Sequence, residues 1–103
     1  MKLNVLERIT LMQILPSEGS YATYKILTDL RVQLSFNEEE YKRFGMKEAN
    51  AQITWQKSED RDFIFGEKAT SIVQDALKKL DEQGKITMQT SSLFEKFIEE
   101  LKV

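Results

Sequence analysis

The chain of 103 residues has no cysteine and no histidine, and it contains only one proline and four glycines. Without cysteine it has no disulfide, no thiolate metal site and no cysteine nucleophile, so a reducing compartment suits it. Without histidine it lacks the usual general base and the commonest metal ligand. We therefore expect a protein that is not an enzyme and that uses no metal or cofactor. So little proline and glycine also argues against a linker or a low-complexity chain.

Long hydrophobic runs are also missing. The first residues, MKLNVLERITLMQIL, resemble a signal peptide in their basic second residue and apolar run. Glu7, Arg8 and Gln13 interrupt that run, and no small-residue cleavage site follows it. A membrane span needs about 18 or more apolar residues, and no stretch approaches that length. The sequence thus predicts a soluble, cytoplasmic protein with no membrane association.

Charge of one sign is not in excess either. The formal net charge is −2, with seven basic and seven acidic residues in 1–50, and eight basic and ten acidic residues in 51–103. Proteins that bind nucleic acid usually cluster lysine and arginine, because release of counterions from phosphates supplies much of the affinity. This even distribution disfavours a nucleic-acid partner.

What the chain does contain is a strong helical pattern in a composition of 41% hydrophobic and 31% charged residues. Such values are typical of a globular protein, and the length predicts one domain over residues 1–103. Asn4 and Glu7 form a capping-box pair at the start of a first amphipathic helix, which Pro16 ends. A second helix is predicted from about Ser20.

The clearest local signal is the stretch SFNEEEYKRFG, which predicts a short third helix. Asn37 is placed to cap it, and Glu40 is placed to reach back from the third helical position. Phe36 and Tyr41 occupy the positions of a hydrophobic staple. Gly45 is suited to the left-handed conformation that often follows the last turn of a helix.

The two-residue period of residues 51–65 predicts a different element. Ile53 and Trp55 alternate with polar residues, and after the polar turn KSEDR the pattern resumes with Phe63 and Phe65. This pattern is typical of a half-buried antiparallel hairpin. Two strands alone are only marginally stable, so we expect the apolar face of this hairpin to pack on helices as part of the core.

A fourth helix follows between Gly66 and Gly84, and a last helix is predicted from about Ser92 with Glu95 at its third position. The fold class is therefore α+β and mostly helical. The expected order is three N-terminal helices, a β-hairpin and two C-terminal helices.

The densest cluster of acidic residues consists of Glu59, Asp60, Asp62 and Glu67. Aspartate is common in turns because it hydrogen-bonds to the local backbone. The spacing lacks the glycine and the downstream glutamate of a calcium loop. We therefore assign it neither catalysis nor metal binding, and nothing in the chain indicates a small-molecule ligand.

The predicted last helix suggests a function through protein contacts. Its apolar stripe of Phe94, Phe97, Ile98 and Leu101 is large for a short terminal helix and needs a surface to cover it. A second copy of the chain in a homodimer, or another protein, would supply that surface. In the alternative monomer, the helices and the hairpin simply cover one another.

A second function class is a winged-helix-like DNA-binding protein, because three helices followed by a hairpin is the element order of many such domains. The third helix would then read the groove and the hairpin would be the wing. Against this hypothesis, Glu38, Glu39 and Glu40 stand at the start of the third helix and would face phosphates. The hairpin tip is also of mixed charge.

Finally, LNVLERITLMQILPSEGSYATYKI, together with LSFNEEEYKRFG, QITWQ and GEKATSIVQDALKKLDEQGKIT, resembles small uncharacterised proteins of tailed bacteriophages and prophages. The resemblance covers most of the chain, but its residues are helix caps and core positions. It implies an origin in a phage or prophage and a place in the cytoplasm of a bacterial host. It also implies action by binding, and it assigns a role to no individual residue.

Overall fold

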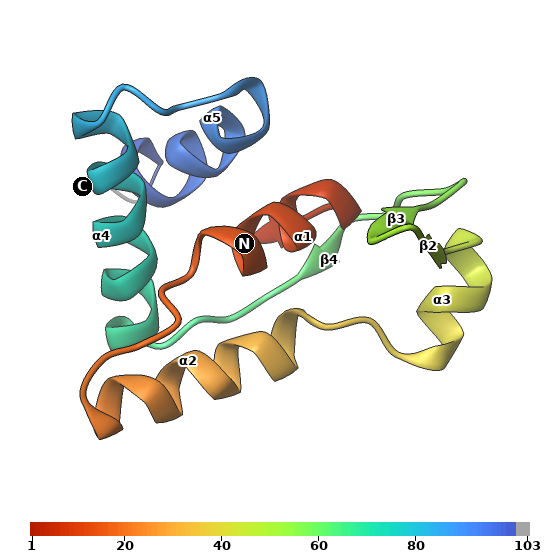
Figure 1. Ribbon diagram of the computed structural model, residues 1–103, viewed down its shortest axis with the longest axis horizontal. Helices are drawn as coiled ribbons and strands as arrows, with labels where there is room; N and C mark the ends of the chain where they lie inside the picture. Colours follow the sequence, from red (N-terminus) through yellow and green to blue (C-terminus); the bar gives the residue numbers. More distant parts are fainter. Residues whose placement is uncertain (101–103) are drawn as a thin grey trace.

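The computed structural model describes residues 1–100 and shows a mostly helical α+β chain with two small antiparallel sheets (Figure 1). The helices, in chain order, are α1 (Val5–Ile14), α2 (Tyr21–Leu34), α3 (Glu38–Phe44), α4 (Glu67–Glu82) and α5 (Met88–Phe94), followed by a π-helical segment η1 (Glu95–Glu99). The strands are β1 (Lys2–Leu3), β2 (Lys47–Ala49), β3 (Gln52–Thr54) and β4 (Arg61–Asp62). The predicted fold class is confirmed at this level.

Local sequence signals set the ends of the N-terminal helices. The side chain of Asn4 accepts a hydrogen bond of 2.8 Å from the backbone N–H of Glu7, and Asn37 accepts one of 2.8 Å from that of Glu40. Both sites are complete capping boxes, because each glutamate also accepts from the backbone of its asparagine. Gly45 follows α3 with φ +62°. The predicted caps are therefore confirmed.

The pairing predicted between residues 51–55 and 63–65 is wrong. Strand β3 pairs instead with β2, the segment before it, and β4 pairs with β1 at the start of the chain. The β2–β3 turn places Asn50 at φ +53° and Ala51 at φ +61°, the geometry of a two-residue hairpin. A period of two shows that a segment is extended with one buried face, but it does not identify the partner strand.

The last helix begins earlier than predicted. Thr87 is its N-cap, and it forms a capping box with Thr90 at the third helical position. The sequence instead predicts Ser92 as the N-cap and Glu95 at the third position. A threonine hydroxyl caps a helix as a serine does, so two start signals competed in the sequence. Ser92 instead donates a hydrogen bond to Glu7 in α1, at 2.9 Å.

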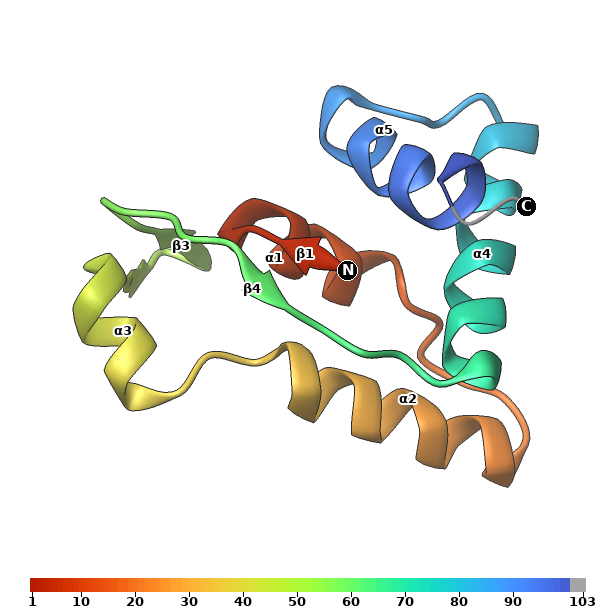
Figure 2. The same cartoon turned by 180° about the vertical axis from the view of Figure 1, so that it is seen from behind.

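Two hydrophobic clusters hold these elements together. The larger one joins β1, α1, α2, α4, α5 and η1, and consists of Leu3, Leu11, Leu15, Leu27, Leu30, Leu34, Phe63, Val73, Leu77, Leu93, Phe97 and Ile98. The smaller one consists of Val5, Phe44 and Met46, with Ile9, Phe36, Ile53 and Trp55 packed on it. Figures 1 and 2 show α1 between the body formed by α2, α4 and α5 and the lobe formed by α3, β2 and β3. Helix α1 contributes to both clusters.

The arrangement leaves α2 along one edge of the molecule. Helix α2 contacts α1 and α4, and in both ribbon views nothing lies beyond its other side (Figures 1 and 2). Within residues 1–100, no helix combines the length and the hydrophobicity required to cross a membrane.

Candidate functional site

The structure places the predicted contact residues of the last helix against the chain's own core. Phe97 is 0% exposed, Ile98 is 6% exposed, and Phe94 is partly buried. The Phe97 ring lies 5.7 Å from that of Phe65, measured between centroids. Leu101 lies outside the described residues. Helices α1 and α4 contact α5, and α4 also contacts η1. In the single chain Phe97 and Ile98 are therefore packed in the interior and offer little surface to a partner.

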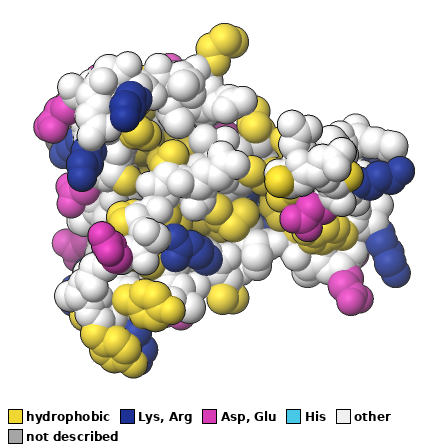
Figure 3. Space-filling view, viewed as in Figure 1, with side chains coloured by type: hydrophobic (Ala, Val, Ile, Leu, Met, Phe, Trp, Pro, Cys, Tyr) yellow, Lys and Arg dark blue, Asp and Glu magenta, His cyan; other side chains and the backbone are white. Residues whose placement is uncertain are grey.

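Exposed apolar side chains gather instead on the outer face of α2. Tyr21 is 75% exposed, Tyr24 51% and Val32 71%. Lys25 and Thr28 are exposed on the same face. We call these five residues the α2 stripe. Hydrophobic side chains are visible along the lower edge of the molecule, over α2, in Figure 3.

The stripe carries both aromatic and charged groups. The Nζ atom of Lys25 lies 5.7 Å from the centroid of the Tyr21 ring, which is within the range of a cation–π contact. Asp29 is exposed one helical turn beyond Lys25. Sequence reasoning missed this surface, although a signal was present: two tyrosines and a valine occupy positions opposite the leucine face of the helix.

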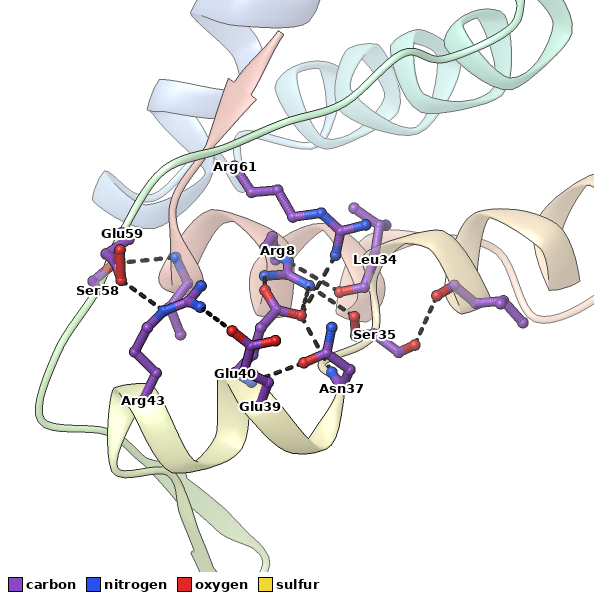
Figure 4. Close-up of polar contacts among 12 residues, drawn as sticks. Arg8, Leu34, Ser35, Asn37, Glu39, Glu40, Arg43, Ser58, Glu59 and Arg61 are labelled. Carbon is purple, nitrogen blue, oxygen red and sulfur yellow. Dashed lines mark hydrogen bonds and ion pairs between the residues drawn. The ribbon is translucent and has the colours of Figure 1, made fainter.

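The most unusual buried group is Arg8 in α1, which is 0% exposed (Figure 4). Its Nη1 donates to Glu40 Oε2 in α3 at 2.6 Å. Its Nε donates to the carbonyl oxygen of Leu34 at 3.1 Å, and its Nη2 donates to that of Ser35 at 2.7 Å. The guanidinium also lies 3.9 Å from the centroid of the Phe36 ring. Arg8 therefore joins α1 to the end of α2 and to the start of α3.

The carboxylate of Glu40 is held in its charged form. Burial acts to raise the pKa of Glu40, but hydrogen bonds from Arg8 and from the backbone of Asn37 outweigh burial, with help from the charges of Arg8 and Arg61. The net effect lowers the pKa below its ordinary value. Sequence reasoning identified Glu40 as a capping residue and did not find its ion pair with Arg8. The sequence did contain a signal for this ion pair, because Arg8 is a charged residue inside the broad apolar stripe of α1.

A second buried carboxylate, Glu7, joins α1 to the C-terminal helices. Lys96 Nζ donates to its Oε1 at 2.9 Å, and the Ser92 hydroxyl donates to its Oε2 at 2.9 Å. Burial acts to raise the pKa of Glu7, whereas these bonds, the Asn4 backbone bond and the charge of Lys96 lower it, and the lowering prevails. Both buried carboxylates thus have partners that account for their burial.

Two members of the acidic cluster near the predicted hairpin pair with different partners. Glu59 accepts from Arg43 Nε at 2.8 Å, and Asp62 accepts from the amino group of Met1 at 3.0 Å. Among residues 1–100, no three acidic side chains are grouped closely enough to hold a metal ion. The described part of the chain therefore offers no candidate metal centre.

A groove of about 490 Å³ lies between α2 and the start of α4. Its lining includes the apolar Ile26 and Ala69 together with Asp29, Glu67 and Lys68. Specific ligand sites usually combine an apolar cavity with a few polar groups that converge on one point. This groove carries charges of both signs, as does the polar rim of a protein interface. It therefore fits the edge of a contact surface beside the α2 stripe better than a ligand site.

Trp55 is half-buried rather than fully buried or fully exposed. It packs on the smaller hydrophobic cluster and also lines a groove of about 320 Å³ with Leu6 and Ile53. Its packing is thus mainly internal, although the side chain is not fully covered.

No protein-family model, no curated protein and no solved structure matches this chain. The candidate surface therefore rests on the geometry of the residues described above.

Proposed function

We propose that this protein acts without catalysis, by contact with another protein, and that the α2 stripe is its contact surface. The observation that carries this proposal is the exposure of Tyr21, Tyr24 and Val32 on one face of a helix at the edge of the molecule. Single exposed hydrophobic residues are common on protein surfaces, but a group on one face marks interaction sites.

The chemistry of the stripe suits such a role. Tyrosine is enriched at protein interfaces, because its ring buries a large area with few rotatable bonds and its hydroxyl tolerates water in the free state. Recognition through one face of a helix is also a recurrent mode, and here Tyr21 and Tyr24 lie one turn apart, with Val32 about two turns further along the same face. Ile64 and Met88 are exposed as well, but they lie on other segments and do not extend the stripe.

The resemblance to small phage and prophage proteins agrees with this proposal. A phage or prophage origin would place the chain in the cytoplasm of a bacterial host. The partner would then be a host protein, a phage protein or a second copy of the chain.

The winged-helix alternative has weaker support. Helix α3 carries Glu38 and Glu39 in its first turn, and Glu39 is paired with Arg43 at 3.2 Å. The hairpin that follows α3 is β2–β3, whose turn contains Asn50 and Ala51 and no basic residue. A DNA-binding role would have to overcome the repulsion between phosphates and these glutamates.

The test compares three versions of this 103-residue chain as bait in a lysate of the host cell. Light scattering on each of the three chains by itself measures self-association. The stripe variant carries Tyr21→Ser, Tyr24→Ser and Val32→Ser. The matched control carries Ile64→Ser and Met88→Ser, which remove exposed apolar groups outside the stripe.

We expect the wild type and the control to capture the same protein or to self-associate, and we expect the stripe variant to do neither. Circular dichroism will establish that all three chains are folded. Equal binding by the stripe variant, or the absence of any partner including self, would contradict the proposal.

A further inference from the structure

The α2 stripe is complementary to itself, and we propose that it binds a second copy of this chain, with the two α2 helices packed antiparallel. This inference rests on the proposed function and names its partner. It differs from the dimer that the sequence predicts, in which the last helix forms the interface. The apolar residues Phe97 and Ile98 of that helix are buried within the single chain.

The spacing of the stripe is the first argument. Tyr21, Lys25, Thr28 and Val32 follow one another at intervals of four, three and four residues. Alternating intervals of three and four place side chains along one line of a helix, as in the seam of a coiled coil. All four residues are exposed. The line therefore runs along the free side of α2 for most of its length.

The symmetry of that spacing is the second argument. The intervals read the same in both directions, with a midpoint between Lys25 and Thr28. A two-fold axis at this midpoint sets Tyr21 opposite Val32 of the second copy, and Lys25 opposite Thr28 of the second copy. Tyr21 and Val32, the large apolar side chains at the two ends of this line, thus meet each other, as an interface formed by the same patch on both subunits requires.

The charges provide the third argument. At 100° per residue, Lys25 and Asp29 lie on the same side of the stripe, and a perpendicular two-fold axis keeps them on that side in both copies. Lys25 of one copy is then offset along the axis by about 1.5 Å, one helical residue, from Asp29 of the other. Two ion pairs related by symmetry result. Within residues 1–100, neither residue forms an ion pair of its own.

The same charges select the antiparallel orientation. In a parallel pair, Lys25 would face Lys25 of the second copy across the seam, and the Asp29 of each copy would lie on the opposite side of the interface from that of the other, so that it could not offset this repulsion. Like charges placed opposite each other at an interface disfavour that arrangement. An interface of one helix face is small, so we expect a weak, reversible dimer with a dissociation constant of about micromolar or above.

The test is sedimentation equilibrium of the full chain from low micromolar to hundreds of micromolar, with charge-reversal variants. Lys25→Glu and Asp29→Lys each convert both symmetric pairs into repulsions, and the double variant restores attraction with the signs exchanged. Lys78→Glu, on the exposed face of α4, is the matched control. All of these side chains are exposed, so the fold is expected to persist in each variant.

We expect the wild type and Lys78→Glu to dimerise alike. Each single stripe variant should dimerise about tenfold more weakly, because two attractions become repulsions, and the double variant should recover most of that loss. A wild type that stays monomeric at hundreds of micromolar would overturn the inference, and so would single variants that dimerise like the wild type or a double variant that recovers nothing.

Failure of this inference is distinguishable from failure of the proposed function. If the wild type is monomeric but captures another protein that the Tyr21→Ser, Tyr24→Ser, Val32→Ser variant loses, the stripe serves a foreign partner and only the inference fails. If the chain neither dimerises nor captures a partner through the stripe, both fail.

Discussion

At the scale of single residues, Arg8 shows how a charge is accommodated inside this small protein. Its guanidinium is removed from water but is compensated by the Glu40 carboxylate, by two backbone carbonyls and by the face of the Phe36 ring. A buried ion pair of this kind adds little net stability over apolar packing, whereas removal of one partner leaves an uncompensated charge. The pair therefore makes the junction of α1, α2 and α3 sensitive to substitution.

We predict that Glu40→Gln destabilises the chain by about 3 to 5 kcal/mol, because Arg8 would remain buried without a countercharge. Urea denaturation followed by circular dichroism measures the change, and loss of the cooperative transition would be the extreme form of the same result. The control is Glu39→Gln, whose side chain is exposed, with an expected change of about 0.5 kcal/mol or less. Equal effects of the two variants would show that the Arg8–Glu40 pair is not structurally important.

At the scale of elements, helix ends and strand pairing were predictable to different degrees. The caps at Asn4 and Asn37 follow from side chains only three residues from the groups they bind. The last helix was harder to place, since Thr87 and Ser92 are both good caps and the choice depends on what surrounds each. Ser92 bonds to Glu7, a residue 85 positions away, and no local pattern indicates such a contact.

Two glycines, Gly45 and Gly84, follow the ends of α3 and α4. Gly45 and Gly84 both have a left-handed backbone, at φ +62° and +67°, which disfavours a side chain at either site by about 1 to 2 kcal/mol. A Cβ at Gly45 would also approach the side chain of Gln56 to 3.3 Å, whereas nothing lies within 4 Å at Gly84.

We therefore predict that Gly84→Ala destabilises the chain by about 1 kcal/mol, and that Gly45→Ala costs more, about 2 kcal/mol. Urea unfolding of the two variants beside the wild type measures the difference. A larger loss at Gly84 than at Gly45 would contradict the crowding argument.

At the scale of the whole molecule, two buried carboxylates connect α1 to the elements on either side of it. Glu40 of α3 binds Arg8 of α1, and Glu7 of α1 binds Lys96 and Ser92 in the C-terminal helices. The pKa of each carboxylate is lowered in the folded chain from an ordinary value of 4.5. Such groups stabilise the fold fully above their unfolded pKa, and they cease to do so as the pH falls through the folded pKa.

We predict that the stability of the wild type falls as the pH drops below about 4.5. In that range Glu7 and Glu40 bind protons more readily in the unfolded chain than in the folded chain, where their pKa is lowered. Thermal unfolding measured in steps from pH 7 to pH 3 follows this loss. The variant Glu7→Gln removes one of the two groups, so its stability should start lower at neutral pH and decline less steeply in acid. A variant curve that stays parallel to that of the wild type would show that Glu7 contributes nothing to the acid response.

The sequence by itself determined the class of the fold, the boundaries of most helices and the chemistry that the chain lacks. These features depend on composition and on contacts between residues a few positions apart, which a pattern records directly. Only the tertiary structure decided the partners of the strands, the burial of Arg8 and the apolar surface that remains free. Met1 bonds to Phe63 across 62 positions, and Arg8 bonds to Glu40 across 32. From the sequence we expect the stripe of Phe94, Phe97, Ile98 and Leu101 to need a covering surface, but not which surface supplies it. Packing within the chain covers Phe97 and Ile98 and leaves the α2 stripe open, because exposure depends on which elements meet in three dimensions.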